Sequence, residues 1–129
     1  MIAAVQTVEG VVLVDVAEEQ ILGDGNELPE VDAPGVELPR VVATARAGST
    51  IAAIVERRPP LAISRDNGST WTEAGGGLPA GFAVAIAEDD PDRMLYAARN
   101  RLYVSANGGV FWRALAIELP DIVDVAWID

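Results

Sequence analysis

The feature that most constrains this chain is an internal repeat. The stretch SRDNGSTW at 64–71 returns as SANGGVFW at 105–112, 41 positions later. Leu-Pro pairs stand at 38–39, 78–79 and 119–120, and a short apolar stretch follows each pair. A period of about 40 residues indicates that one supersecondary unit is built several times, and that neighbouring units bury each other's apolar faces.

Each unit divides into four short strands. The predicted strands are rich in Val, Ile and Ala. Residues typical of turns, namely Gly, Asn, Asp and Pro, separate these strands. None of the strands shows a helical period over the length of a helix. In the two complete units the predicted strands are 41–46, 50–56, 60–64 and 70–74, and 82–87, 94–99, 101–106 and 111–116. The first unit offers 2–7, 11–16 and an outer strand within 18–31, and the tail 122–129 supplies the innermost strand that it lacks.

Four-stranded units of this length are typical of the blades of a β-propeller. We therefore predict an all-β fold in a single domain over 1–129, with three four-stranded blades at 1–39 plus 122–129, 40–79 and 80–121. Closed rings of this kind have about four to eight blades, and an open arc of three leaves sheet faces and edges uncovered. We expect a homodimer of six blades, in which 122–129 pairs with the first unit of the other copy. Two alternatives remain open, namely a longer gene product or a different chain that completes the ring.

The stretch at 64–71 resembles the Asp-box, Ser-x-Asp-x-Gly-x-Thr-Trp, of the bacterial neuraminidase repeat (BNR) in sialidase-like propellers. All five fixed positions match, at Ser64, Asp66, Gly68, Thr70 and Trp71. The second copy keeps Ser105, Gly108 and Trp112, with Asn107 in place of the Asp and Phe111 in place of the Thr. The resemblance implies a hairpin turn between the third and fourth strands of a blade, away from the catalytic centre. We interpret the box as structural, because Asp and Ser side chains bond a turn's own backbone and Gly accepts a positive φ.

The residue types that are absent exclude several kinds of site. The chain has no Cys, His or Lys, and its nine positive charges are all Arg. Without Cys and His there is no disulfide and no zinc or copper ligand set, and most nucleophile–base pairs are missing. We predict no cofactor and no metal. The run EDDPD at 88–92 could ligate a cation through oxygen, but we interpret it as a solvated turn.

The net charge of −11 narrows the range of partners. Negative charge repels a phosphate backbone and an anionic membrane surface, so we predict neither nucleic acid nor a membrane as partner. The longest apolar runs are far shorter than a membrane span of about 18 residues, and the first residues lack the basic region of a signal peptide. We therefore expect a cytoplasmic protein.

Catalysis of the sialidase type uses a Tyr nucleophile and several Arg. We expect Tyr96 and Tyr103, the two tyrosines of the chain, to be core residues of middle strands. Seven arginines near strand ends and turns are expected on the surface: Arg57, Arg58, Arg65, Arg93, Arg99, Arg101 and Arg113. A site made of paired carboxylates remains open, because the chain has 20 acidic residues.

A binding site is expected at the mouth of the central tunnel, where the innermost strands 41–47, 82–88 and 122–128 converge. These strands carry three unusual residues, Arg46, Asp124 and Trp127, which could hold a sugar or a small anion, although Trp127 can also be core between blades. Our leading hypothesis is a non-enzymatic BNR-type binding or scaffold module, assembled by dimerisation, with a protein or carbohydrate ligand. The alternatives are a sialidase-like glycoside hydrolase, or its inactive relative, that uses carboxylates at the tunnel, and a purely structural half-propeller without a ligand.

Overall fold

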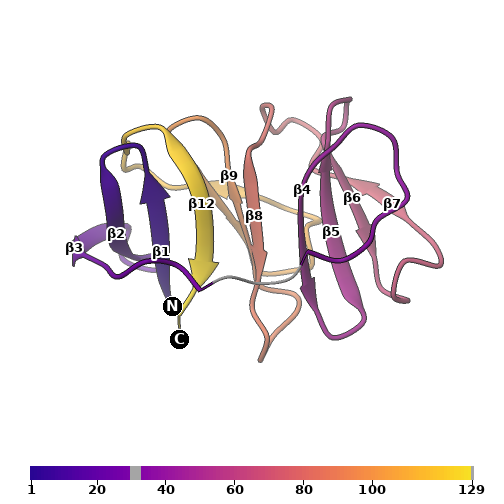
Figure 1. Cartoon of the computed structure of the whole chain (residues 1–129), viewed down its shortest axis with the longest axis horizontal. Helices are drawn as coiled ribbons and strands as arrows, with labels where there is room; N and C mark the ends of the chain where they lie inside the picture. The colour runs from indigo at the N-terminus through magenta and orange to yellow at the C-terminus, as the bar shows by residue number, and fades with distance from the viewer. Residues whose placement is uncertain (30–32, 129) are drawn as a thin grey trace.

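Twelve strands pair into three antiparallel sheets of four in the computed structural model, which describes residues 1–29 and 33–128 (Figure 1). We call these sheets blades 1, 2 and 3. In spatial order, blade 1 contains β12 (Ile122–Trp127), β1 (Ile2–Thr7), β2 (Gly10–Asp15) and β3 (Gln20–Asp24). Blade 2 contains β4 (Val41–Ala47), β5 (Thr50–Val55), β6 (Leu61–Ser64) and β7 (Thr72–Ala74), and blade 3 contains β8 (Ala83–Ile86), β9 (Met94–Ala97), β10 (Leu102–Ser105) and β11 (Arg113–Ala114). No helix that could cross a membrane occurs in the described ranges.

The predicted all-β fold with three four-stranded blades is confirmed, including the use of the tail to complete the first unit. β12 pairs antiparallel with β1, so that Ala3 lies opposite Trp127 and Val5 opposite Val125. Within one chain this partner is the chain's own β1, and pairing with a second copy stays a prediction. The outer strand predicted within 18–31 is β3, and positions 30, 31 and 129 of the predicted strands lie outside the described residues.

The outer strands β7 and β11 are shorter than the sequence predicts. β7 begins at Thr72 rather than at position 70, because the N–H and the hydroxyl of Thr70 both donate to Asp66 and hold Thr70 in the preceding turn. β11 has two residues, since the N–H of Phe111 donates to Asn107 in the same way. The polar turns therefore take residues that the strand pattern alone assigns to the outer strands.

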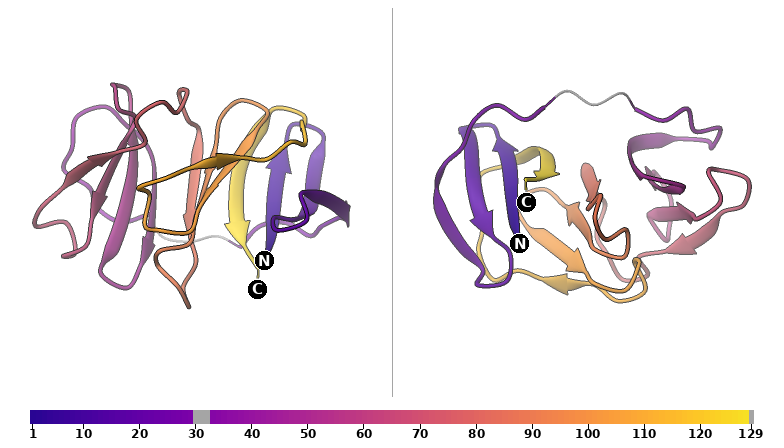
Figure 2. Two further views of the ribbon diagram at one scale, coloured as in Figure 1. Left: turned by 180° about the vertical axis from the view of Figure 1, so that it is seen from behind. Right: turned by 90° about the horizontal axis from the view of Figure 1, so that it is seen from below.

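Blade 3 lies between blades 1 and 2. Its inner strand β8 packs beside β12 on one side and beside β4 on the other, so that the three predicted innermost strands are neighbours at the centre of the arc (Figure 2). The segments 25–29 and 33–40, which belong to the connection from β3 to β4, run along the open side of this arc. The connection therefore joins the two blades that stand at opposite ends of the molecule.

Two hydrophobic cores hold the blades together, one on each face of blade 3. The first core contains Val5 of blade 1 and Leu95 of blade 3. The second contains Ile54 of blade 2 and Tyr96 of blade 3. β8 and β9 of blade 3 are buried at every position, as are β5 and β6 of blade 2, and none of these strands shows the alternation of a sheet with one solvated face.

We expect the substitution Gly109→Ala to weaken the packing of blade 3 on blade 2. Gly109 has a φ of 89°, and a Cβ at this position would lie 2.5 Å from Cδ1 of Ile63 on the neighbouring blade. The free energy of unfolding, measured by urea denaturation, should fall by about 1–3 kcal/mol. Gly77→Ala is the matched control, because Gly77 has the same φ of 89° and a Cβ there meets nothing within 4 Å. Equal losses in the two variants would contradict this account of the contact between the blades.

Candidate functional site

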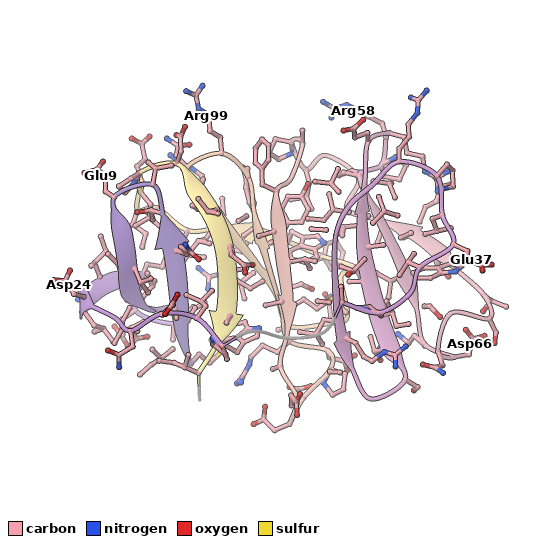
Figure 3. The ribbon with its side chains drawn as sticks, in the orientation of Figure 1. Glu9, Asp24, Glu37, Arg58, Asp66 and Arg99 are labelled. Atoms are coloured by element: carbon pink, nitrogen blue, oxygen red, sulfur yellow. The ribbon has the colours of Figure 1, made fainter. Side chains whose placement is uncertain are left out.

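The turn at 64–71 is held together by its own side chains. Ser64 Oγ donates to Asp66 Oδ1 over 2.8 Å and accepts the N–H of Gly68 over 2.8 Å. The N–H of Thr70 donates to Asp66 Oδ1 over 2.8 Å, and the Thr70 hydroxyl donates to Oδ2 over 2.6 Å. These bonds, with the Thr70 hydroxyl first, lower the pKa of Asp66 from 3.8 to about 2. Asp66 lies at the outer edge of the molecule, away from the inner strands (Figure 3).

The turn at 105–112 repeats this arrangement and corrects one predicted match. Ser105 Oγ donates to Asn107 Oδ1 over 3.0 Å and accepts the N–H of Gly109 over 2.9 Å. Gly109, rather than the predicted Gly108, is therefore the counterpart of the fixed glycine in the first turn. Gly108 has a φ of 72°, the left-handed conformation that Asn67 adopts in the first turn with a φ of 60°. The offset of 41 positions between the two stretches also pairs Gly68 with Gly109, so the predicted match to Gly108 was one position too early.

The two tryptophans of these turns differ in what covers them. Trp112 belongs to the second core, where its ring lies 5.8 Å from that of Tyr96, and its Nε1–H donates to the carbonyl of Gly109 over 2.9 Å. Trp71 is half-buried and is a member of neither core. In both turns, the side chains either form hydrogen bonds within the turn or pack against neighbouring residues.

Tyr96 is a core residue whose hydroxyl is already bonded. It is 0% exposed, and its hydroxyl donates to the carbonyl of Pro79 over 2.6 Å. Burial raises the pKa of Tyr96 to about 12. Tyr103 packs edge-on against it with ring centroids 6.2 Å apart, so both tyrosines are placed as predicted. A buried, protonated hydroxyl of this kind is a poor nucleophile.

Five of the seven predicted surface arginines are exposed, whereas Arg101 and Arg93 are half-buried. Arg58 and Arg99 point away from the sheets (Figure 3), and Arg99 pairs with Asp121 at 3.3 Å. The side chain of Arg93 is only 17% exposed, and its guanidinium lies 4.8 Å above the ring of Trp127. The prediction was wrong for Arg93 because this contact joins β12 to the start of β9, which are neighbours only in the fold.

The inner strands line one cavity of about 950 Å³. Residues 44–46 come from β4, residues 84–86 from β8 and residues 124–127 from β12. The structure therefore brings Arg46, Asp124 and Trp127, the three residues chosen from the sequence, to the walls of the same cavity. Gln6 of β1, Glu88 and Asp89 after β8, and residues 27–29, 33 and 34 of the connection between β3 and β4 complete its described lining.

The charges along this cavity are mostly negative. Its described lining contains four carboxylates, those of Glu27, Glu88, Asp89 and Asp124, and one cation, Arg46. Asp124 Oδ1 accepts the N–H of Val125 over 2.9 Å, which leaves the rest of this carboxylate to face the cavity. Low-dielectric walls with one predominant sign of charge attract the opposite sign, so the cavity favours a cationic group over an anionic one.

Trp127 belongs to the cavity and to a core at once. It lines the cavity while it packs against the core between blades 1 and 3. The guanidinium of Arg93 covers one face of its ring. The Nε1–H of Trp127 is buried and has no hydrogen-bond acceptor in the described part of the chain. One face of the Trp127 ring is therefore already covered and is not open to a ligand.

Two aspartates of the acidic run at 88–92 form ion pairs with arginines. Asp89 pairs with Arg93 at 3.4 Å, and Asp92 pairs with Arg65 at 3.2 Å. Asp90 Oδ1 accepts the N–H of Asp92 over 3.1 Å. Within residues 1–29 and 33–128, no group of three or more acidic side chains is arranged to hold a metal ion. The loop is a turn with ion pairs.

The part of the cavity lining that sequence reasoning missed is the connection between β3 and β4. The connections at 75–82 and 115–121 have eight and seven residues, whereas 25–40 has sixteen. This doubled length is the signal that could have drawn attention to it, because a longer connection is needed only where the joined strands lie far apart.

Comparison with known proteins shows which solved structures share this fold. No family model matches the sequence, and no curated protein matches it. Among solved structures, the GH74 enzyme of Niastella koreensis superposes with a TM-score of 0.55 and 20% identity over 92% of this chain, and YCF48 bound to D1 peptide superposes with a TM-score of 0.53 and 16% identity, also over 92%. Both are β-propeller proteins. The chain folds as part of a β-propeller. It spans only 18% of the GH74 chain and 38% of the YCF48 chain, and at these identities the likeness shows the fold alone.

We expect the hydrogen bonds of Asp66 to make stability depend on acid pH. The pKa of Asp66 is lowered in the folded chain, so its stabilising contribution is present above about pH 4 and is lost as the pH falls toward 2. The variant Asp66→Asn should lose this part of the acid dependence while keeping an acceptor for the N–H of Thr70, as Asn107 does for Phe111. Urea midpoints between pH 7 and pH 2.5 measure the difference.

The reciprocal variant Asn107→Asp serves as the control for this titration. It should add a pH dependence of the same sign but smaller, because Phe111 has no hydroxyl to donate to the new carboxylate. Acid profiles of wild type and Asp66→Asn that run parallel would show that the carboxylate of Asp66 makes no such contribution.

Proposed function

We propose that the chain is a non-enzymatic binding module of the BNR, Asp-box propeller class, and that its ligand is a basic, extended segment of a partner protein. The observation that carries the proposal is the acidic cavity of about 950 Å³, to which all three inner strands contribute. Arg46, Asp124 and Trp127 are the residues assigned to ligand contact. We propose no cofactor.

Several features favour a peptide over a sugar. Stacking on a sugar needs a free aromatic face, and Arg93 already covers one face of Trp127. The cavity combines carboxylates with apolar wall residues such as Val84 and Ile86, which suits a chain that alternates basic and apolar side chains. YCF48, which shares the fold, is a propeller that was solved with a peptide bound. The net charge of −11 adds long-range attraction for a basic partner.

The rival function is carboxylate-based glycoside hydrolysis. It draws on the carboxylates of Glu88, Asp89 and Asp124 along the cavity and on the fold that the chain shares with the GH74 enzyme. Against a sialidase-like mechanism stands Tyr96, since its hydroxyl is buried and bonded to Pro79. Turnover of fluorogenic glycosides that is abolished by Asp124→Asn would establish the rival and overturn the binding proposal.

The second part of the proposal is assembly from two copies. Blades 1 and 2 each have one face that no other blade of the same chain covers, because blade 3 lies between them. A sheet that is apolar on both faces needs a neighbour on each side. A second copy supplies both missing neighbours at once and brings the number of blades to six.

We expect peptide binding to follow charge. In a fluorescence titration with three short peptides that differ only in a central lysine, glutamine or glutamate, the lysine peptide should bind tightest. Asp124→Asn should weaken its binding about tenfold, or about 1.4 kcal/mol, because it removes a cavity carboxylate. Glu9→Gln removes an exposed carboxylate outside the cavity (Figure 3) and is the control. Equal affinities for the three peptides would contradict the proposed ligand.

We expect light scattering on a sizing column to give a mass near twice the 13.6 kDa of the chain. The reason is that one copy leaves two blade faces without a blade against them. A stable species of 13.6 kDa would contradict the assembly and leave the peptide proposal to the titration.

A further inference from the structure

Three of the four Leu-Pro pairs, at 38–39, 78–79 and 119–120, each stand shortly before the inner strand of a blade. Leu78 leads into β8 and is 4% exposed in the core between blades 2 and 3. Leu119 leads into β12 and is 5% exposed in the core between blades 3 and 1. Leu38, which leads into β4 at the same place in the repeat, is half-buried and belongs to neither core. The repeat thus provides a leucine for a third core that the single chain does not build.

The lengths of the connections agree with this reading. The connections 75–82 and 115–121, with eight and seven residues, each join the outer strand of one blade to the inner strand of the next. The sixteen residues of 25–40 join β3 to β4, which lie at opposite ends of the arc. An ordinary connection at this place would lead from β3 into the blade directly beside it.

The two end faces carry the residues that a third core needs. On blade 1, Val5 faces blade 3, and strand alternation turns Leu13, the partner of Ala4, to the opposite face, where it is only half-buried. On blade 2, Ile54 faces blade 3, and Ile51 lies on the other face, next to the turn that carries Trp71. Trp112, the counterpart of Trp71, packs in the core between blades 2 and 3.

We propose that two copies exchange their first three strands, so that β1–β3 of one copy pair with β12 of the other. This inference rests on the proposed dimer and states how the dimer is joined. Each shared blade then stands directly beside blade 2 of the copy that supplies β1–β3, and residues 25–40 span two adjacent blades. Leu38, Leu13 and Trp71 meet in the third core, as Leu78 and Trp112 do in the core between blades 2 and 3.

The exchange completes the binding site from two copies. In the ring of six blades, β12 of one copy stands beside β4 of the other, so that Asp124 and Trp127 of one copy lie next to Arg46 of the second copy. All hydrogen bonds between β1 and β12 keep their register, since the exchanged strands are identical. The exchange therefore keeps every backbone hydrogen bond between β1 and β12, and it places another blade against the outer faces of blades 1 and 2.

A pair of engineered cysteines tests the exchange directly, because the chain has no cysteine of its own. Ala4 and Ala126 lie opposite each other in the β1–β12 ladder, at the separation that a disulfide requires. In the Ala4→Cys, Ala126→Cys double variant, oxidation should link two chains, and non-reducing electrophoresis should show a band near twice 13.6 kDa that reductant returns to 13.6 kDa. Each single variant is the control and should give no such band.

Other results of this experiment separate the exchange from the dimer. A cross-linked single chain from a protein that scatters light as a dimer overturns the exchange and leaves the dimer. A cross-linked single chain from a protein that scatters as a monomer overturns both.

A shortened connection provides a second, independent test. Deletion of residues 28–35 leaves eight residues between β3 and β4, the number found at 75–82. With exchanged strands this length suffices, so the variant should remain a folded dimer with a urea midpoint close to that of wild type. A variant that is unfolded, aggregated or monomeric overturns the exchange, because a chain that closes on its own β1 needs the longer connection.

Discussion

The structure depends on one constraint, namely that the four-stranded sheets bury their apolar side chains against one another in two cores. Blade 3 does this on both faces within the chain, and its strands β8 and β9 are buried at every position. Blades 1 and 2 have another sheet on one face only, and in blade 2 the strands β5 and β6 are nevertheless buried at every position. The position of β12 beside β8, the placement of the cavity and the course of residues 25–29 and 33–40 all follow from how these sheets are arranged around blade 3.

The blades were predictable because the signals that define them are local. A repeat of about 40 residues, short apolar runs and turns rich in Gly and Asn give the strand count, and the lone strand at 122–127 gives the closure of blade 1. The residues at which β7 and β11 begin could not be predicted from strand patterns. They depend on hydrogen bonds from the N–H groups of Thr70 and Phe111 to the side chains of Asp66 and Asn107. The choice of Gly108 was an alignment error of one position, because the offset of 41 pairs Gly68 with Gly109 and the hydrogen bond from Gly109 to Ser105 agrees with that pairing.

The position of the candidate site could be predicted from the sequence, whereas its charge and free aromatic surface could be predicted only in part. Arg46, Asp124 and Trp127 could be chosen because they stand out in strands that are otherwise made of small apolar residues. The stacking of Arg93 on Trp127 and the arrival of residues 27–29 at the cavity depend on contacts between segments far apart in the sequence. Those contacts change the expected ligand, because they reduce the free aromatic surface and add negative charge.

The pairing of β1 with β12 also sets an order on folding. Blades 2 and 3 are built from strands that follow one another closely, so their hairpins form from local contacts. Blade 1 needs residues from both ends of the chain, since Ala3 lies opposite Trp127. During synthesis, β1 therefore leaves the ribosome well before its partner strand β12 is made. On a messenger that carries several ribosomes, the edge of β1 is exposed while β12 strands of preceding chains are already finished.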